Sequence, residues 1–144
     1  MSDSIVIASA QFAVVRQLTH ELPNMPPERL SAYGFPNSDV EYLSSMMRAF
    51  RELTDHYAQV RFDVVDMEGT SLRGDRSPDV HIEGCGSELV AVAELRREVA
   101  SRWPHALDFV TSWLGDRELF LRTGFRPDEA REAIDLLRRL LLIC

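Results

Sequence analysis

Residues 57–67, which read YAQVRFDVVDM, decide which fold class the sequence predicts. Apolar and polar side chains alternate from Val60 to Val64, and a period of two is typical of a strand with one buried face. The same stretch also fits a helix, because Tyr57, Val60, Val64 and Met67 lie three or four positions apart. The spacing by itself leaves both structures open.

Composition favours the strand. Residues 60–67 are rich in β-branched and aromatic side chains, which fit the half-buried surface of a sheet. Residues 69–78 then contain the glycine and proline of a turn, and residues 79–83 (DVHIE) alternate again. The sequence therefore predicts one small β-hairpin made of residues 60–67 and 79–83.

Apolar residues three or four positions apart predict helices before this hairpin. Residues 4–22 form the first such pattern, although its first turn, residues 5–7, also suits a strand. Four prolines then interrupt the pattern, so we expect a largely irregular connection over residues 23–38. A second helix is expected to begin at Ser38 or Asp39, either of which suits an N-cap.

The C-terminal part also has helical spacing. A helix is expected from Ser87 to Pro104, because five apolar side chains share one face: Leu89, Val92, Leu95, Val99 and Trp103. Further helices are expected from Pro104 to Gly115 and from Pro127 onward, and the two tryptophans are expected in the core. The fold class that follows is mainly α, a bundle of about five helices with the small hairpin, in a single globular domain of residues 1–144.

The charge of the chain excludes some partners and some chemistry. The formal net charge is −7, and all 16 basic residues are arginine. An acidic protein repels the phosphate backbone, so nucleic acid is an unlikely partner, and a protein with a basic surface is the better match. Without lysine there is no Schiff-base nucleophile. No cofactor-binding glycine motif occurs in the sequence, and we expect no cofactor.

The cysteine count and the hydropathy pattern predict a cytoplasmic protein. The sequence has two cysteines, too few for a disulfide framework, which favours a reducing compartment. No stretch reaches the roughly 18 apolar residues that a membrane span needs. We therefore expect no contact with a membrane.

Reactive side chains are most concentrated at the predicted second strand. His81, Glu83 and Cys85 alternate there and would share one face. These are the side-chain types of a zinc site, although more than two residues of one strand rarely reach one ion. Cys85 also lies between two glycines just before the expected helix, where a helix N-terminus activates a thiol. Cys85 as nucleophile with His81 as base is one candidate active site; an ordinary solvated strand and a small buried cysteine are the alternatives.

A second candidate lies in the expected helix after Ser38. Arg51 and His56 are separated by four residues, and this spacing resembles the catalytic motif of the HEPN ribonuclease family. That resemblance implies a helical ribonuclease. With 16 arginines and 4 histidines in 144 positions, chance alone predicts about 1.3 matches over the permitted spacings of four to six residues, and a solvated Arg51 is the simpler interpretation.

The last helix suggests a different class of function. Its apolar stripe widens toward the end and includes Leu137, Leu140 and Leu141, so it must be covered on more than one side. A central position in the bundle explains this, and so does a surface for a partner or a second copy of the chain. We expect a non-catalytic, regulatory protein-binding factor (an antagonist, immunity-type or adaptor protein); a small enzyme centred on Cys85 and His81 is the alternative.

Overall fold

Four strands form one mixed sheet in the computed structural model, which describes residues 3–53, 56–66 and 79–143. In the order of the sheet they are β1 (Asp3–Ala8), β2 (Gln59–Val65), β4 (Val90–Arg96) and β3 (Val80–Glu83). The central pair, β2 and β4, is parallel, whereas β1 and β3 run antiparallel to the strands beside them. The two edges of the sheet are therefore β1 and β3.

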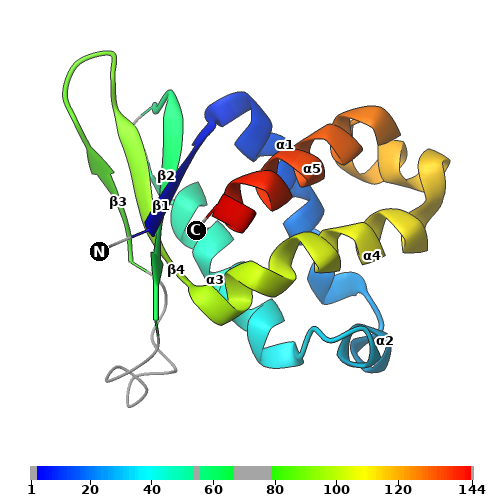
Figure 1. The fold of residues 1–144 in the computed structure, drawn as a ribbon. Coiled ribbons are helices and arrows are strands. Elements are labelled where there is room, and N and C mark those ends of the chain that lie inside the picture. Colours follow the sequence, from blue (N-terminus) through cyan, green and yellow to red (C-terminus); the bar gives the residue numbers. More distant parts are fainter. Residues whose placement is uncertain (1–2, 54–55, 67–78, 144) are drawn as a thin grey trace.

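The helices form a second layer on one side of this sheet, as Figure 1 shows. In chain order they are α1 (Ser9–His20), a 3-10 turn η1 (Leu22–Asn24), α2 (Pro27–Ala32), α3 (Asn37–Arg51), α4 (Arg97–Thr123) and α5 (Pro127–Ile143). The other side of the sheet carries no helix (Figure 1) among the residues that the structure describes.

The prediction of a mainly α bundle is wrong, because two stretches expected to be helical are strands of the sheet. Residues 3–8 form β1, which bears out the strand alternative for residues 5–7, and residues 90–96 form β4 in place of the first two turns of a helix. The error at β4 has a physical cause. Ala91, Val92 and Ala93 are all buried, so β4 lacks the alternation of buried and exposed side chains that identifies a strand with one solvated face.

The predicted hairpin is wrong in its pairing. Strands do form at β2 and β3, close to the expected positions, but β4 lies between them and pairs with both. Residues 69–78 and Met67 lie outside the described residues. The predicted hairpin assumed that β2 pairs with the next strand in sequence. Instead β3 forms a hairpin with β4, and β4 pairs with β2 on its other edge.

The predicted end of the helix that follows β4 is also wrong. We expected a stop at Pro104, but α4 continues through it, since packing of one face onto the core sustains a helix despite a lost hydrogen bond. The expected stop at Gly115 is confirmed as a break within α4, where Gly115 has φ 76° and ψ 167°. The expected start of the last helix at Pro127 is also confirmed.

The core lies between the sheet and the helices. Alternate strand residues point into it, among them Ile5, Ile7, Val60, Phe62, Ala91 and Leu95. The Phe62 ring meets the Trp103 ring of α4 edge-on at 5.5 Å between centroids and the Phe12 ring of α1 at 5.9 Å. Each such aromatic side chain contributes roughly 1.5–3 kcal/mol by its burial. These contacts fix which face of the sheet is turned away from the helices.

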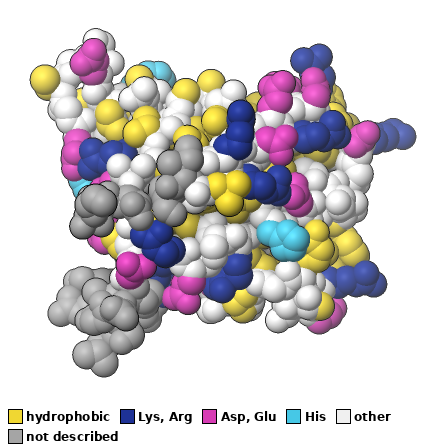
Figure 2. Space-filling view, viewed as in Figure 1, with side chains coloured by type: hydrophobic (Ala, Val, Ile, Leu, Met, Phe, Trp, Pro, Cys, Tyr) yellow, Lys and Arg dark blue, Asp and Glu magenta, His cyan; other side chains and the backbone are white. Residues whose placement is uncertain are grey.

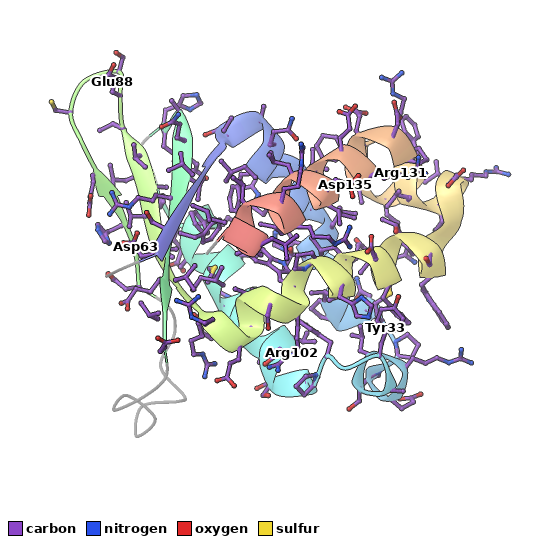
Figure 3. All side chains as sticks on the ribbon, in the orientation of Figure 1. Tyr33, Asp63, Glu88, Arg102, Arg131 and Asp135 are labelled. Carbon is purple, nitrogen blue, oxygen red and sulfur yellow. The ribbon has the colours of Figure 1, made fainter. Side chains whose placement is uncertain are left out.

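Two polar contacts tie the helices together. The buried Asp39 carboxylate of α3 accepts hydrogen bonds from Nε and Nη2 of Arg102 of α4, at 2.8 and 2.7 Å. The indole of Trp103 donates to the Thr19 hydroxyl of α1 at 3.1 Å. Arg102, labelled in Figure 3, lies on α4 beside the start of α3.

Candidate functional site

The face of the sheet turned away from the helices carries most of the polar strand residues. Since side chains alternate along a strand, the partners of the core residues point outward. They include Ser4 and Val6 of β1, Arg61 and Asp63 of β2, Glu94 and the buried Val92 of β4, and His81 and Glu83 of β3. We call this surface the open sheet face.

Three carboxylates form a row across this face at one end of the sheet. Asp63 of β2 is the direct register partner of Glu94 of β4. On the other side of Glu94, the backbone carbonyl of Asp79, just before β3, accepts a hydrogen bond from the Glu94 N–H at 3.3 Å. Neighbouring strands lie about 4.8 Å apart, so three like charges stand in adjacent positions.

The two outer carboxylates of the row have cationic partners. Arg61 donates from Nε to Asp63 Oδ1 at 3.0 Å and pairs through Nη2 with Glu83 Oε1 at 3.3 Å. Asp79 Oδ2 lies 3.1 Å from Nδ1 of His81. Glu94, in the middle, is exposed, and its carboxylate forms no ion pair with any residue that the structure describes.

His81 is held between two carboxylates. Its Nε2 lies 2.8 Å from Glu83 Oε2, while Nδ1 faces Asp79. Only the protonated ring can donate from both nitrogens. The hydrogen bond with Glu83, supported by the charge of Asp79, therefore raises the pKa of His81 above its ordinary value. The same hydrogen bond from His81, with the nearby charge of Arg61, lowers the pKa of Glu83.

Cys85 and His81 do not form a catalytic pair in this arrangement. Cys85 is exposed in the turn between β3 and β4. Both ring nitrogens of His81 face carboxylates, and within the described ranges no hydrogen bond joins the ring to the thiol. The described residues also contain no group of three or more His, Cys, Asp or Glu side chains placed to hold a metal ion, a set that includes His81, Glu83 and Cys85.

The three leucines of the last helix have different surroundings. Leu137 is fully buried in the core, whereas Leu140 and Leu141 are half-buried at its edge. Leu142 is 78% exposed. Helix α5 therefore uses most of its stripe within the molecule, against α1 and α4, and leaves its end on the surface (Figure 1).

Arg51 and His56 are not on one helix. Helix α3 ends at Arg51, and His56 lies in the segment that leads into β2. The placement on a single helix on which the resemblance to HEPN ribonucleases rested is therefore wrong. His56 instead lines a pocket of about 310 Å³ together with its neighbour Tyr57 and four residues of α1: Ser9, Phe12, Ala13 and Arg16.

An aromatic cluster lies in the helical layer, between α4 and the residue that follows α2. Along α4 the rings of His105, Phe109 and Trp113 follow one another at intervals of four, and Tyr33 stacks on His105 at 4.2 Å. Trp113 is 46% exposed, so its expected place in the core is wrong, whereas Trp103 is in the core as expected. Figure 3 labels Tyr33 beside α4.

Figure 2 shows that acidic and basic side chains are interspersed over the helical layer in this view. In the row of carboxylates, by contrast, three acidic side chains stand next to one another without a basic residue between them. His81 and Glu83 were candidates from the sequence alone, whereas Asp63, Glu94 and Arg16 were not. The alternation in residues 60–64 could have assigned Asp63 to a solvated face, whereas Glu94 needed the position of β4.

No helix in the described part of the chain is both long and apolar enough to cross a membrane. Comparison with known proteins found no match among protein-family models, curated proteins or solved structures.

Proposed function

We propose that this protein is a non-catalytic binding protein that holds a protein partner with a basic surface against its open sheet face. The observation that carries the proposal is the row Asp63–Glu94–Asp79, whose central carboxylate has no cationic partner among the described residues. Like charges opposite each other on neighbouring strands destabilise a sheet. An arrangement that costs stability in the free protein is understandable where a ligand supplies the missing charge.

The position of the row supports a partner of protein size. The face belongs to strands, which hold side chains more rigidly than loops, and no described helix covers it. Val6 of β1 is 45% exposed on the same face, so an apolar contact is available beside the charges. A mixture of a charged region and an exposed apolar side chain is typical of a protein interface.

The charge of the face indicates the sign of the partner. Four carboxylates, Asp63, Asp79, Glu83 and Glu94, surround Arg61 and His81. An arginine or lysine of the partner would meet Glu94 without displacing an existing ion pair. Complementary charge accelerates encounter and makes it sensitive to salt, so binding through this face should weaken as salt rises.

The experiment compares capture by three forms of the protein. Tagged wild type, Glu94→Arg and Glu132→Arg are used to retain proteins from a lysate of the native cell at low and moderate salt. Glu132 is an exposed carboxylate on α5, so its substitution makes the same change in net charge away from the sheet. The proposal predicts a basic protein that wild type and Glu132→Arg retain and Glu94→Arg loses. It is contradicted if all three forms retain the same proteins, or if wild type retains none.

A further inference from the structure

We propose that the pocket beside the first turns of α1 binds a small phosphomonoester, with its phosphate group between Arg16 and His56. The pocket has a volume of about 310 Å³, at the lower end of the range for small-molecule sites, which begins at roughly 300 Å³. This site is separate from the open sheet face and does not depend on the function proposed above.

The lining supplies the two features that such a ligand needs. Arg16 and His56 are the cationic or ionisable groups, and Ser9 adds a hydroxyl whose own proton is donated to the Tyr57 carbonyl at 2.6 Å. Tyr57, which is half-buried, provides aromatic surface in the lining, and the buried Phe12 lies beneath it in the core. A charged end with an aromatic side suits a phosphate that carries an apolar or aromatic group better than a free ion.

The chain arrangement that brings these residues together is fixed by the sheet. β1 ends at Ala8, opposite Gln59 of β2, and the Ser9 N–H donates to the Ala58 carbonyl at 3.0 Å. The start of α1 and the segment entering β2 therefore meet at one end of the sheet (Figure 1). The first turn of a helix also carries partial positive charge, which adds to the side chains.

Two arginines contribute positive charge on this side of the molecule: Arg16, which lines the pocket, and Arg51, whose charge acts with that of Arg16 on His20. Arg16 and Arg51 form no ion pair with a carboxylate in the parts of the chain that the structure places, whereas six other described arginines do: Arg61, Arg97, Arg102, Arg122, Arg126 and Arg138. Their charges act on His20, one turn after Arg16 on α1. Partial burial and the nearby charges of Arg16 and Arg51 lower the pKa of His20 below its ordinary value. The two arginine charges favour an anion, and the Glu21 carboxylate offsets them only in part at His20, whose pKa stays below its ordinary value.

Arginine suits the phosphate and explains the choice of variants. Its planar guanidinium donates two parallel hydrogen bonds to a phosphate, so a neutral replacement removes both the charge and the fork. Arg16→Gln is the first test variant and His56→Gln the second, because neither side chain makes a hydrogen bond that holds the described structure together. Arg131→Gln is the matched control, since Arg131 is an exposed arginine on α5 (Figure 3).

Calorimetric titration of the full chain with phenyl phosphate and with inorganic phosphate tests the proposal. We expect phenyl phosphate to bind wild type and Arg131→Gln equally, and tenfold or more weakly in Arg16→Gln. Inorganic phosphate should bind at least tenfold more weakly than phenyl phosphate. Circular dichroism confirms that each variant is folded, and His56→Gln replaces Arg16→Gln if the latter is not.

Three outcomes would overturn the proposal: no heat of binding in wild type at millimolar phenyl phosphate, equal binding in all folded variants, or equal affinity for the two probes. The first two remove the site, and the third removes the aromatic part of the ligand. None of them bears on the binding proposed for the open sheet face, because none of the carboxylates of that face lines the pocket.

Discussion

Asp63 and Glu94 stand directly opposite each other on the parallel strands β2 and β4, with both side chains on the face that no described helix covers. Asp63 is neutralised by Arg61 at 3.0 Å, whereas Glu94 forms no ion pair among the described residues. Figure 3 labels Asp63 in the strand layer. This relationship links stability to binding, since the same charge that weakens the free sheet attracts a cation.

Glu94→Gln should therefore stabilise the free protein. Removing the central charge relieves repulsion from Asp63 and Asp79, and cross-strand pairs contribute roughly 0.2–1 kcal/mol. Urea unfolding at low salt should give a higher free energy of unfolding for Glu94→Gln than for wild type. The difference should shrink at high salt, which screens surface charges.

Glu132→Gln is the control for that measurement, because it removes one carboxylate from α5 and should leave stability within about 0.5 kcal/mol of wild type. A Glu94→Gln protein that is less stable than wild type would show that Glu94 has a stabilising partner and would remove the basis of the proposed function.

The His81–Glu83 pair should contribute stability within a defined pH range. The pKa of His81 is raised from 6.5, so its contribution is complete below pH 6.5 and is lost as pH rises through the folded value. The pKa of Glu83 is lowered from 4.5, so its contribution is complete above pH 4.5 and is lost as pH falls through the folded value. The pair is therefore strongest between pH 4.5 and 6.5.

Histidine NMR measures this directly. The His81 ring should titrate above 6.5 in wild type, and the Glu83→Gln variant should move its pKa back toward 6.5. An unchanged His81 titration in Glu83→Gln would contradict the hydrogen bond between them.

The Asp39–Arg102 ion pair should matter more than exposed pairs. Asp39 is 5% exposed, and Asp39→Ala leaves the guanidinium of Arg102 without its partner. We expect a loss of about 1–3 kcal/mol in the free energy of unfolding. The control Asp135→Ala breaks an exposed pair with Arg138 and should change stability by less than about 0.5 kcal/mol. Equal effects of the two substitutions would contradict the role assigned to Asp39.

The Thr19 hydroxyl should be required by the core indole. Thr19→Val keeps the shape of the side chain but leaves the Trp103 N–H, which is fully buried, without an acceptor. An unsatisfied buried donor costs about 1–3 kcal/mol. Thr111→Val, at a half-buried position on α4, is the control, and its smaller effect in thermal unfolding would distinguish loss of the indole hydrogen bond from loss of any threonine hydroxyl.

The sequence predicted the parts of the fold that depend on local signals. Helix α5 begins at Pro127, and Gly115 interrupts α4, because proline and glycine act on the backbone wherever they occur. Strand β2 was predicted from the alternation of residues 60–64, which reflects one buried face.

The rest depended on contacts between distant residues. In β4 the run Val90–Ala93 is apolar on both faces, and the spacing of Leu89, Val92 and Leu95 imitated a helix. No local pattern states that β4 inserts between β2 and β3. Asp63 and Glu94 are 31 positions apart in the sequence, and only the pairing of β4 with β2 brings them together. Arg16 and His56 are also far apart in the sequence, and the pairing of β1 with β2 brings the segments that carry them to one pocket.

Retention of a basic protein by the tagged variants is the most direct test, because it measures whether the Glu94 carboxylate is needed for binding. Wild type and Glu132→Arg should retain the same basic protein at low salt and release it at higher salt, while Glu94→Arg retains none. Retention of that protein by Glu94→Arg at the wild-type level would contradict the account.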